Sequence, residues 1–483
     1  MSDNLYRIPL SGDEIYILEK PEFSTKIIQD LLRFYKEYQE KNFIYFIKLR
    51  KLWHKENPGR KYPGLCADIN PITGEFRAPD KQIGWSWGDA RGLGIWTSFL
   101  ISNSVPDKDM EIPLENEKSI KINLKKEMQN YCRDIYETLL ERYEKNKGVL
   151  PFRVDIDSNK PFKGGDYINI EKSQCGYGNL FAINGFFQYG IYKSDPRAIE
   201  IAREILENSF KAVKNETFRS EYQSIDRNIR THSPRMIIIG AAVDIFKSIC
   251  HMEKKGITAY SHHREQMISD LLPFIDYIIE EHYRKNPPGF WEYNNKEGKP
   301  MKDENGQIKT DPGHATETAG FLAEIVPFLP REGTGRISRE HILNTALNIH
   351  LFADQAGWSP RGVMFKAVDL ITFKPIADSL GPMGNRIPTA PWWNVREHCG
   401  AALRLYTLTG DKRCLESYRK AQNASFLYYP NKRIDGQMLQ TIDPYTLEPL
   451  DILPATGNLD PMHDARARCR EVENLELLLK NMK

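Results

Sequence analysis

The sequence predicts an all-α protein: a closed (α/α)6 toroid, or barrel, of six helical hairpins, with long loops and short β-hairpins at one end. Three observations predict this class. Twelve helical patterns recur along the 483 residues, amphipathic charged helices alternate with apolar ones, and one helical segment repeats further along the chain. The alternation indicates an inner ring of helices shielded by an outer ring.

The two kinds of helix occupy alternate positions along the chain. The amphipathic, charged helices are predicted at 24–52, 123–146, 195–213, 263–284, 338–355 and 411–426. The apolar helices, rich in small residues, are predicted at 88–103, 178–192, 234–251, 313–329, 391–409 and 464–481. Because no linker or low-complexity segment divides the chain, we expect residues 1–483 to form a single barrel domain.

An internal repeat supports an array of hairpins. The segment that begins Ser194-Asp-Pro-Arg matches the one that begins Gly410-Asp-Lys-Arg, and the match reaches the Ser-Phe pairs at 209–210 and 425–426. These are the fifth and eleventh predicted helices, three hairpins apart. A stacked or circular array is the natural interpretation, and six hairpins close most simply as a toroid. An open solenoid and an irregular all-α protein are the alternatives.

Long aromatic loops precede the inner helices, at 60–87, 150–177, 287–312, 357–390 and 427–463. Within them, Phe290-Trp-Glu-Tyr-Asn-Asn-Lys-Glu-Gly-Lys-Pro300 has the pattern of strand, turn and strand. Connections from an inner helix to the next outer helix are mostly short, as at Lys193-Ser194. The long loops therefore gather at the end of the barrel where inner helices begin, and functional residues concentrate on such loops.

Composition narrows the class of protein. The net charge of +2, with both signs mixed along the helices, gives no argument for nucleic acid as a partner. The start, Met1-Ser-Asp-Asn-Leu-Tyr-Arg, lacks a signal-peptide pattern, and no apolar run approaches the roughly 20 residues of a membrane span. The seven cysteines are scattered without CxxC spacing, which favours reduced thiols over a zinc site. We expect a cytoplasmic protein without a membrane partner.

The first turns of the inner helices hold the candidate functional residues. They are Trp85, Trp87, Asp89 and Arg91; Tyr177; His232, Ser233 and Arg235; His314 and Glu317; Trp392, Trp393, Glu397 and His398; and His463, Asp464 and Arg466. Helix N-termini also direct free N–H groups and partial positive charge at whatever lies in the mouth of the barrel. This environment stabilises an oxyanion or an enediolate.

Histidines facing one cavity suit proton transfer, because one can act as base while another is acid near neutral pH. Arg91 or Arg466 would hold an oxygen as negative charge develops on it. The structural alternative is that His314 is simply bonded to its neighbour Glu317, one helical turn away. A metal site of histidines alone lacks an assignable carboxylate and supporting partner, so no metal is expected.

Four short motifs share their spacing with a known family. They are Pro312-Gly-His-Ala-Thr-Glu317; Trp392-Trp-Asn-Val-Arg-Glu397 with Tyr406 and Thr409-Gly-Asp411 after it; His463-Asp-Ala-Arg466; and Arg91 within Asp89-Ala-Arg-Gly-Leu. These resemble the PGHxxE, WWxxxE…TGD and HxPR motifs and the first inner-helix arginine of the N-acylglucosamine 2-epimerase family. The resemblance covers most of the chain.

The resemblance implies a cofactor-free sugar epimerase or isomerase on an (α/α)6 barrel, and it suggests a homodimer. It places the general acid and base on His314 and His463, binding of a substrate oxygen on Arg91, and support of ring opening and hydroxyls on Glu317 and Glu397. The sequence departs from the family at Ser233-Pro-Arg-Met-Ile-Ile238, where NPHMHL is common, and at Ala465, where a proline is usual.

The leading hypothesis is therefore a cofactor-free sugar 2-epimerase or aldose–ketose isomerase acting at C2 through an enediolate. The catalytic residues are predicted to be His314, His463, Glu317 and Arg91. The saccharide is predicted to be bound by Trp87, Tyr177, Arg235, Trp392, Trp393, Glu397, His398 and Arg466. The alternatives are a glycoside hydrolase of the unsaturated uronyl type, using paired carboxylates such as Asp89 and Asp311, and a non-catalytic saccharide-binding protein.

Overall fold

The computed structural model describes residues 5–10, 13–61, 64, 69–75, 83–113, 119–161, 175–218, 229–381, 384–452 and 460–482. Parts of the predicted loops 60–87, 150–177 and 427–463 lie outside these ranges. Twelve α-helices occur within the described residues, each at a predicted position. No helix in this part of the chain is long and apolar enough to cross a membrane.

The even-numbered helices form the inner ring. They are α2 (Ser86–Ile101), α4 (Tyr177–Lys193), α6 (Ser233–Lys254), α8 (Pro312–Ile325), α10 (Trp392–Thr409) and α12 (His463–Asn481). Each packs on the next in chain order from α2 to α12, and their residues are buried almost all the way round. Small residues permit this close packing: a Cβ added to Gly185 of α4 would lie 2.9 Å from the backbone oxygen of Ala90 in α2.

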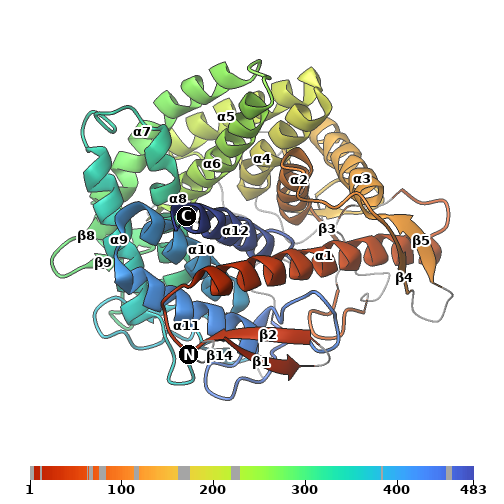
Figure 1. The fold of residues 1–483 in the computed structure, drawn as a ribbon. Helices are drawn as coiled ribbons and strands as arrows, with labels where there is room; N and C mark the ends of the chain where they lie inside the picture. The colour runs from red at the N-terminus through yellow and green to blue at the C-terminus, as the bar shows by residue number, and fades with distance from the viewer. Residues whose placement is uncertain are drawn as a thin grey trace.

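The odd-numbered helices cover the inner ring. They are α1 (Thr25–Glu56), α3 (Leu124–Lys145), α5 (Pro196–Lys214), α7 (Ser261–His282), α9 (Arg339–Ala356) and α11 (Lys412–Tyr428). Red α1 runs beside dark-blue α12 at the closure of the ring (Figure 1), where Tyr35 Oη donates to Glu471 at 3.0 Å. The predicted all-α (α/α)6 toroid is confirmed.

Most outer helices begin at a side-chain cap, as expected from their sequences. Ser24, Asn123, Asp195, Ser338 and Asp411 each accept backbone N–H groups of the first turn. The N-cap residues of α2, α4, α6, α10 and α12 make no such hydrogen bond. Neighbouring loops accept some of these N–H groups instead: Ser86 N–H donates to the Phe152 carbonyl at 3.2 Å, and Trp392 N–H donates to the Gln440 carbonyl at 3.3 Å.

Short antiparallel strands connect successive loops at that end. Four pairs each join the strand before an inner helix to the following loop: β3 (Ile83–Trp85) with β6 (Arg153–Asp155), β7 (Arg230–Thr231) with β10 (Tyr293–Asn294), β11 (Lys309–Thr310) with β12 (Val368–Asp369), and β15 (Ala390–Pro391) with β16 (Thr441–Ile442). The loops therefore brace one another around the mouth of the barrel.

The remaining strands form local hairpins. They are β1 (Leu5–Leu10) with β2 (Asp13–Leu18), β4 (Asp109–Ile112) with β5 (Ile120–Asn123), β8 (Tyr283–Arg284) with β9 (Gly289–Phe290), and β13 (Ser379–Leu380) with β14 (Arg386–Ile387). In the segment 290–300, where strand, turn and strand are predicted, Asn294 forms an isolated β-bridge with Pro300 across a turn. The start of the segment differs from the prediction, because β9 pairs with the preceding strand β8 and not with β10. A short 3-10 helix, η3 (Val326–Phe328), extends α8.

Candidate active site

His314 lies in the first turn of α8, where Asp311 fixes the backbone. One carboxylate oxygen of Asp311 accepts the N–H groups of Gly313 at 2.9 Å and His314 at 3.3 Å. The other oxygen pairs with the ammonium group of Lys366. Asp311 and Pro312 thus set the direction in which the helix, and with it the imidazole, leaves the loop.

His463 begins α12 in the same way. The residues before it read Asp460-Pro-Met-His, as Asp311-Pro-Gly-His does before α8. One oxygen of Asp460 accepts the N–H groups of Met462 at 2.7 Å and His463 at 3.1 Å, and the other pairs with Arg91 of α2. Two Asp-Pro-x-His turns, each anchored by a cation, therefore present the two histidines.

Each histidine also has a buried glutamate as partner. His314 Nδ1 lies 2.9 Å from Glu292 Oε2, and His463 Nδ1 lies 2.8 Å from Glu397 Oε1. Glu292 lies between β9 and β10 and is 3 % exposed, while Glu397 is fully buried in α10. Because an ionised carboxylate only accepts hydrogen bonds, both Nδ1 atoms donate. Nε2 is then the atom of each ring that takes or releases a proton.

The two imidazoles pack against one indole. The ring of His314 lies 5.3 Å from that of Trp393, centroid to centroid, and the ring of His463 lies 5.1 Å from it in a stacked arrangement. The Lys366 ammonium lies 4.6 Å from the same ring centroid, and Trp392 touches His463 edge-on at 5.9 Å. Trp393 therefore fixes both rings relative to each other.

Electrostatics keeps the glutamates ionised and favours the protonated form of His314. Burial alone would raise the pKa of Glu292, but His314 and His232 outweigh it and hold that pKa well below its usual range. Burial likewise opposes ionisation of Glu397, yet Arg466 and its other partners lower the pKa of this carboxyl strongly. Burial lowers the pKa of His314, but Asp311 and Glu292 outweigh it, so the pKa is raised.

A second layer of charges lies beside His463. Arg466 of α12 pairs with Glu317 of α8 and with Glu397, the latter at 2.6 Å, and Arg470 reaches the other Glu397 oxygen at 2.9 Å. Arg466 also lies over the ring of Phe321, 4.7 Å from its centroid. Glu317 is thus bonded to Arg466, and His314 to Glu292. The structural alternative, in which His314 is bonded to Glu317, therefore does not hold.

These residues include one set of metal-type donors. Glu317, Glu397 and His463 each offer an atom, and the three atoms lie within 4.8 Å of one another. Such a donor set would suit a divalent cation. The Arg466 guanidinium already binds both carboxylates, so a side chain supplies the positive charge there. The expectation of no cofactor stays a prediction.

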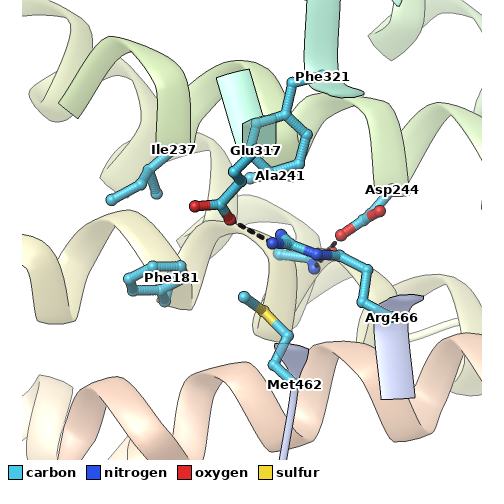
Figure 2. A pocket seen from close by; sticks show the side chains of 9 residues that line it. Phe181, Ile237, Ala241, Asp244, Glu317, Phe321, Met462 and Arg466 are labelled. Atoms are coloured by element: carbon cyan, nitrogen blue, oxygen red, sulfur yellow. Dashed lines mark hydrogen bonds and ion pairs between the residues drawn. The ribbon is translucent and has the colours of Figure 1, made fainter. Parts of the chain in front are cut away.

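A cavity of about 250 Å³, part of it open to solvent, lies at the centre of the inner ring. Figure 2 shows Glu317 and Arg466 on one side of it, with Phe181 and Ile237 opposite. Asn184, Ala241, Asp244, Phe321 and Met462 complete the lining. Ile237 occupies the position where the resemblance leads one to expect the second histidine of NPHMHL, so this wall of the cavity is apolar.

Aromatic residues of α2 and α4 continue the site. Trp87 stacks on Phe181 with ring centroids 5.1 Å apart, and the Arg91 guanidinium lies 4.1 Å from the centroid of the Phe181 ring. Tyr177 lies beside Trp87 at 5.6 Å and donates to Ser233 Oγ at 3.0 Å. Phe181, which lines the cavity, and the Arg91–Asp460 pair connect these residues to the His463 turn.

Two predicted substrate-binding residues lie elsewhere. His398 is fully buried on the far side of α10, where its Nε2 contacts Ser417 at 2.6 Å and Asp354 at 3.2 Å. Arg235 packs toward the outer layer, with its guanidinium 3.6 Å from the centroid of the Tyr277 ring. The structure does not bring either side chain to the group around Trp393.

Several residues of the site were not singled out from the sequence. Glu292, Lys366, Asp460 and Asp244 are among them. The repeated Asp-Pro-x-His pattern at 311–314 and 460–463 was the available signal for Asp460. Glu292 carried only a weak signal, a carboxylate within the aromatic run Phe290-Trp-Glu-Tyr293. Lys366 and Asp244 carried none, since nothing local connects them to a histidine.

Comparison with known proteins gives one family. Residues 164–447 match the family model described as N-acylglucosamine 2-epimerase (GlcNAc 2-epimerase). This segment covers more than half of the chain and includes α4 to α11. The comparison with curated proteins gave no match.

Solved structures share the fold. Cellobiose 2-epimerase from Bacillus thermoamylovorans B4167 is similar with a TM-score of 0.63 and 13 % identity, over 91 % of this chain and 99 % of that chain. A sugar epimerase from a ruminal bacterium also gives 0.63, with 14 % identity over 91 % and 98 %. A D-mannose isomerase gives 0.59, with 15 % identity over 95 % and 98 %. At these identities the likeness shows the fold alone.

Proposed function

We propose that this chain, which belongs to the N-acylglucosamine 2-epimerase family, is a sugar 2-epimerase or aldose–ketose isomerase that moves a proton at C2. One observation carries the proposal. Two Asp-Pro-x-His turns hold His314 and His463 against the same indole, and each Nδ1 is bonded to a buried glutamate. This is the geometry that two exchangeable acid–base groups require.

The chemistry follows from the state of the rings. After the sugar ring opens, Nε2 of one neutral histidine removes the C2 proton, and the electron pair forms an enediolate with the C1 oxygen. A protonated histidine on the other face returns a proton to C2 and gives the epimer. Return of the proton to C1, together with transfer of the O2 proton to O1, instead gives the ketose. The glutamate behind each Nδ1 stabilises the imidazolium that forms.

Arg91 and the charged group around Arg466 stabilise the intermediate. Both guanidinium groups are buried and lie beside aromatic rings, where a developing oxyanion would be poorly screened by water. We assign Arg91 to the enediolate oxygen and Glu317 to ring opening and substrate hydroxyls. Trp87, Tyr177, Trp392 and Trp393 supply apolar faces for the sugar.

The charged partners of the candidate carboxyl groups argue against the hydrolase alternative. It needs one carboxyl group that stays protonated. Asp89 is fully buried against Arg142, Asp311 pairs with Lys366, and Glu397 is surrounded by cations that lower its pKa. Each of these three carboxyl groups has a cation partner, and the cations around Glu397 lower its pKa, so none of the three is suited to act as the general acid.

Four finer points belong to the same proposal. The reaction needs no cofactor, and residues 1–483 act as one barrel domain. The protein works in the cytoplasm, in keeping with the six free cysteines of the described residues. It forms a homodimer, which light scattering after gel filtration tests directly.

The test of the function is proton NMR in D2O with a panel of reducing sugars. The names of the structurally similar enzymes suggest mannose and cellobiose, and the family name adds N-acetylglucosamine. Loss of the C2 proton signal with formation of the epimer or ketose is expected from the wild type, whereas neither H314A nor H463A should interconvert the epimers. Cleavage of a glycoside without exchange at C2 would instead establish a hydrolase. Binding without either reaction would establish a saccharide-binding protein.

A further inference from the structure

Asp244 is a carboxylate inside an otherwise apolar segment of α6. Between Met236 and Phe246 it is the only charged residue. It lines the central cavity together with Glu317 and Arg466, and Figure 2 shows the Asp244 and Arg466 side chains on the same side of this cavity. The side-chain amide of Asn184 donates to Asp244 Oδ2 at 3.3 Å. A carboxylate among apolar neighbours costs free energy unless cations and donors compensate it.

The cation that compensates Asp244 is itself part of the candidate site. Arg466 binds Glu317 and also Glu397, which in turn holds His463. Asp244 attracts Arg466 electrostatically, and Arg466 is the first of its favourable charge partners. The Arg466 guanidinium therefore pairs with two carboxylates, Glu317 and Glu397, while the third carboxylate, Asp244, acts on it through its charge without an ion pair.

We propose that Asp244 is a positioning residue, whose charge acts on Arg466 from the interior of the barrel and so sets how strongly Arg466 binds Glu317 and Glu397. This inference rests on the proposed function. When Asp244 is ionised, its charge offsets part of the charge of Arg466 and leaves Glu397 more negative, which strengthens the Glu397–His463 pair as a base. When Asp244 is neutral, the charge of Arg466 is balanced by Glu317 and Glu397 alone.

The surroundings of Asp244 place its ionisation within the pH range in which enzymes work. Burial raises the pKa of Asp244 to about 6, against the opposing influence of Arg466, Arg470 and Lys247, while Glu324 adds to the rise. Activity that depends on ionised Asp244 is thus low below this pH and rises through it.

Among the described residues, few charged groups act on Asp244 itself, and none of them comes from the neighbouring outer helix α7. From α8 come Glu317 and Glu324, from α12 Arg466 and Arg470, and from α6 itself Lys247. α4 contributes the uncharged Asn184, and its only charged residue, Lys193, ends the helix. The charged residues of α2, Asp89 and Arg91, pair with Arg142 and Asp460.

The test compares D244N with the wild type across pH. Because asparagine mimics the neutral acid, the ratio of kcat for D244N to kcat for wild type should be near one at pH 5 and about tenfold lower at pH 8. KM should change little. D270N, the same substitution at an exposed position of α7, should match the wild type at every pH. A D244N ratio that does not vary with pH would overturn the proposal, since a purely structural role has that signature.

A second measurement needs no turnover. The infrared spectrum of wild type minus that of D244N should show one protonated carboxyl band that disappears with a midpoint near pH 6. N184L removes the amide that donates to Asp244, so both this midpoint and the rise in kcat should move to higher pH. If no sugar reacts but the band titrates and moves in N184L, the proposed function fails while the ionisation of Asp244 stands. Absence of the band, or no movement in N184L, contradicts the inference.

Discussion

The imidazole of His463 stacks on the indole of Trp393, with ring centroids 5.1 Å apart and planes inclined by 27°. His314 packs on the same indole at 5.3 Å, although it comes from a helix two hairpins earlier in the chain. Two histidines that share one rigid neighbour keep a fixed separation. A planar reacting centre held between them can exchange protons with either ring.

Replacement of Trp393 tests this shared support. W393F keeps a ring in place and should retain kcat to within about tenfold, whereas W393L frees both imidazoles and should lower kcat by about 100-fold. W393L should also lose about 3 kcal/mol of unfolding free energy, as large-to-small core changes do. W358L, at a half-buried tryptophan beside His398, should lose stability without this loss of kcat. Equal kcat values for W393F and W393L would refute the role of the indole.

The glutamate behind His463 should matter for both activity and stability. E397Q keeps the shape but removes the charge that binds His463, Arg466 and Arg470. We expect kcat to fall by about 100-fold or more and the unfolding free energy to fall by roughly 3 kcal/mol, since buried cations lose their partner. Steady-state kinetics and chemical denaturation measure the two effects. E416Q, at a half-exposed glutamate that pairs with Arg419, should change neither by much.

The pH dependence should report on Glu292. His314 acts as a base only when neutral, so kcat/KM in the direction that uses it rises as the pH passes its raised pKa. E292Q removes one of the two negative charges that raise this pKa, so the rising limb should move to lower pH. Profiles of kcat/KM between about pH 5 and 9 measure the limb. A limb that stays in place would show that Glu292 does not control His314.

His398 should prove structural. Its Nε2 lies 2.6 Å from Ser417 Oγ, and its ring stacks on that of His350 at 4.3 Å, between α9, α10 and α11. H398L should therefore lower the melting temperature while kcat/KM stays within about threefold of the wild type. Thermal unfolding and kinetics on one preparation decide the matter. Loss of substrate affinity without loss of stability would instead show that His398 is a substrate-binding residue.

The fold was predictable because two kinds of helix alternate along the chain. Apolar and amphipathic segments alternate as far as α11, although the last inner helix, α12, is strongly charged, and the Asp caps at 195 and 411 mark equivalent helix starts. The contacts among His314, His463, Trp393 and Glu397 depend on which helix faces which, and the first-turn pattern anticipated their common location. The roles assigned to these residues stay predictions.

The errors have a simple geometric cause. Consecutive residues on a helix point about 100° apart, so Glu397 reaches the site while His398, its neighbour, turns to the outer layer. On α6 the cavity is lined by Ile237, Ala241 and Asp244, spaced four and three residues apart, which leaves Arg235 on another face. Glu292 lies in a loop, and its approach to His314 depends on strand pairing that local sequence does not specify.

The most direct test of the account follows C2 exchange in the two epimers separately, with H314A and H463A in D2O. If each histidine serves one face, neither variant interconverts the epimers, and each retains exchange of the C2 proton with only one of them. Interconversion at the wild-type rate by either variant would contradict a two-histidine mechanism.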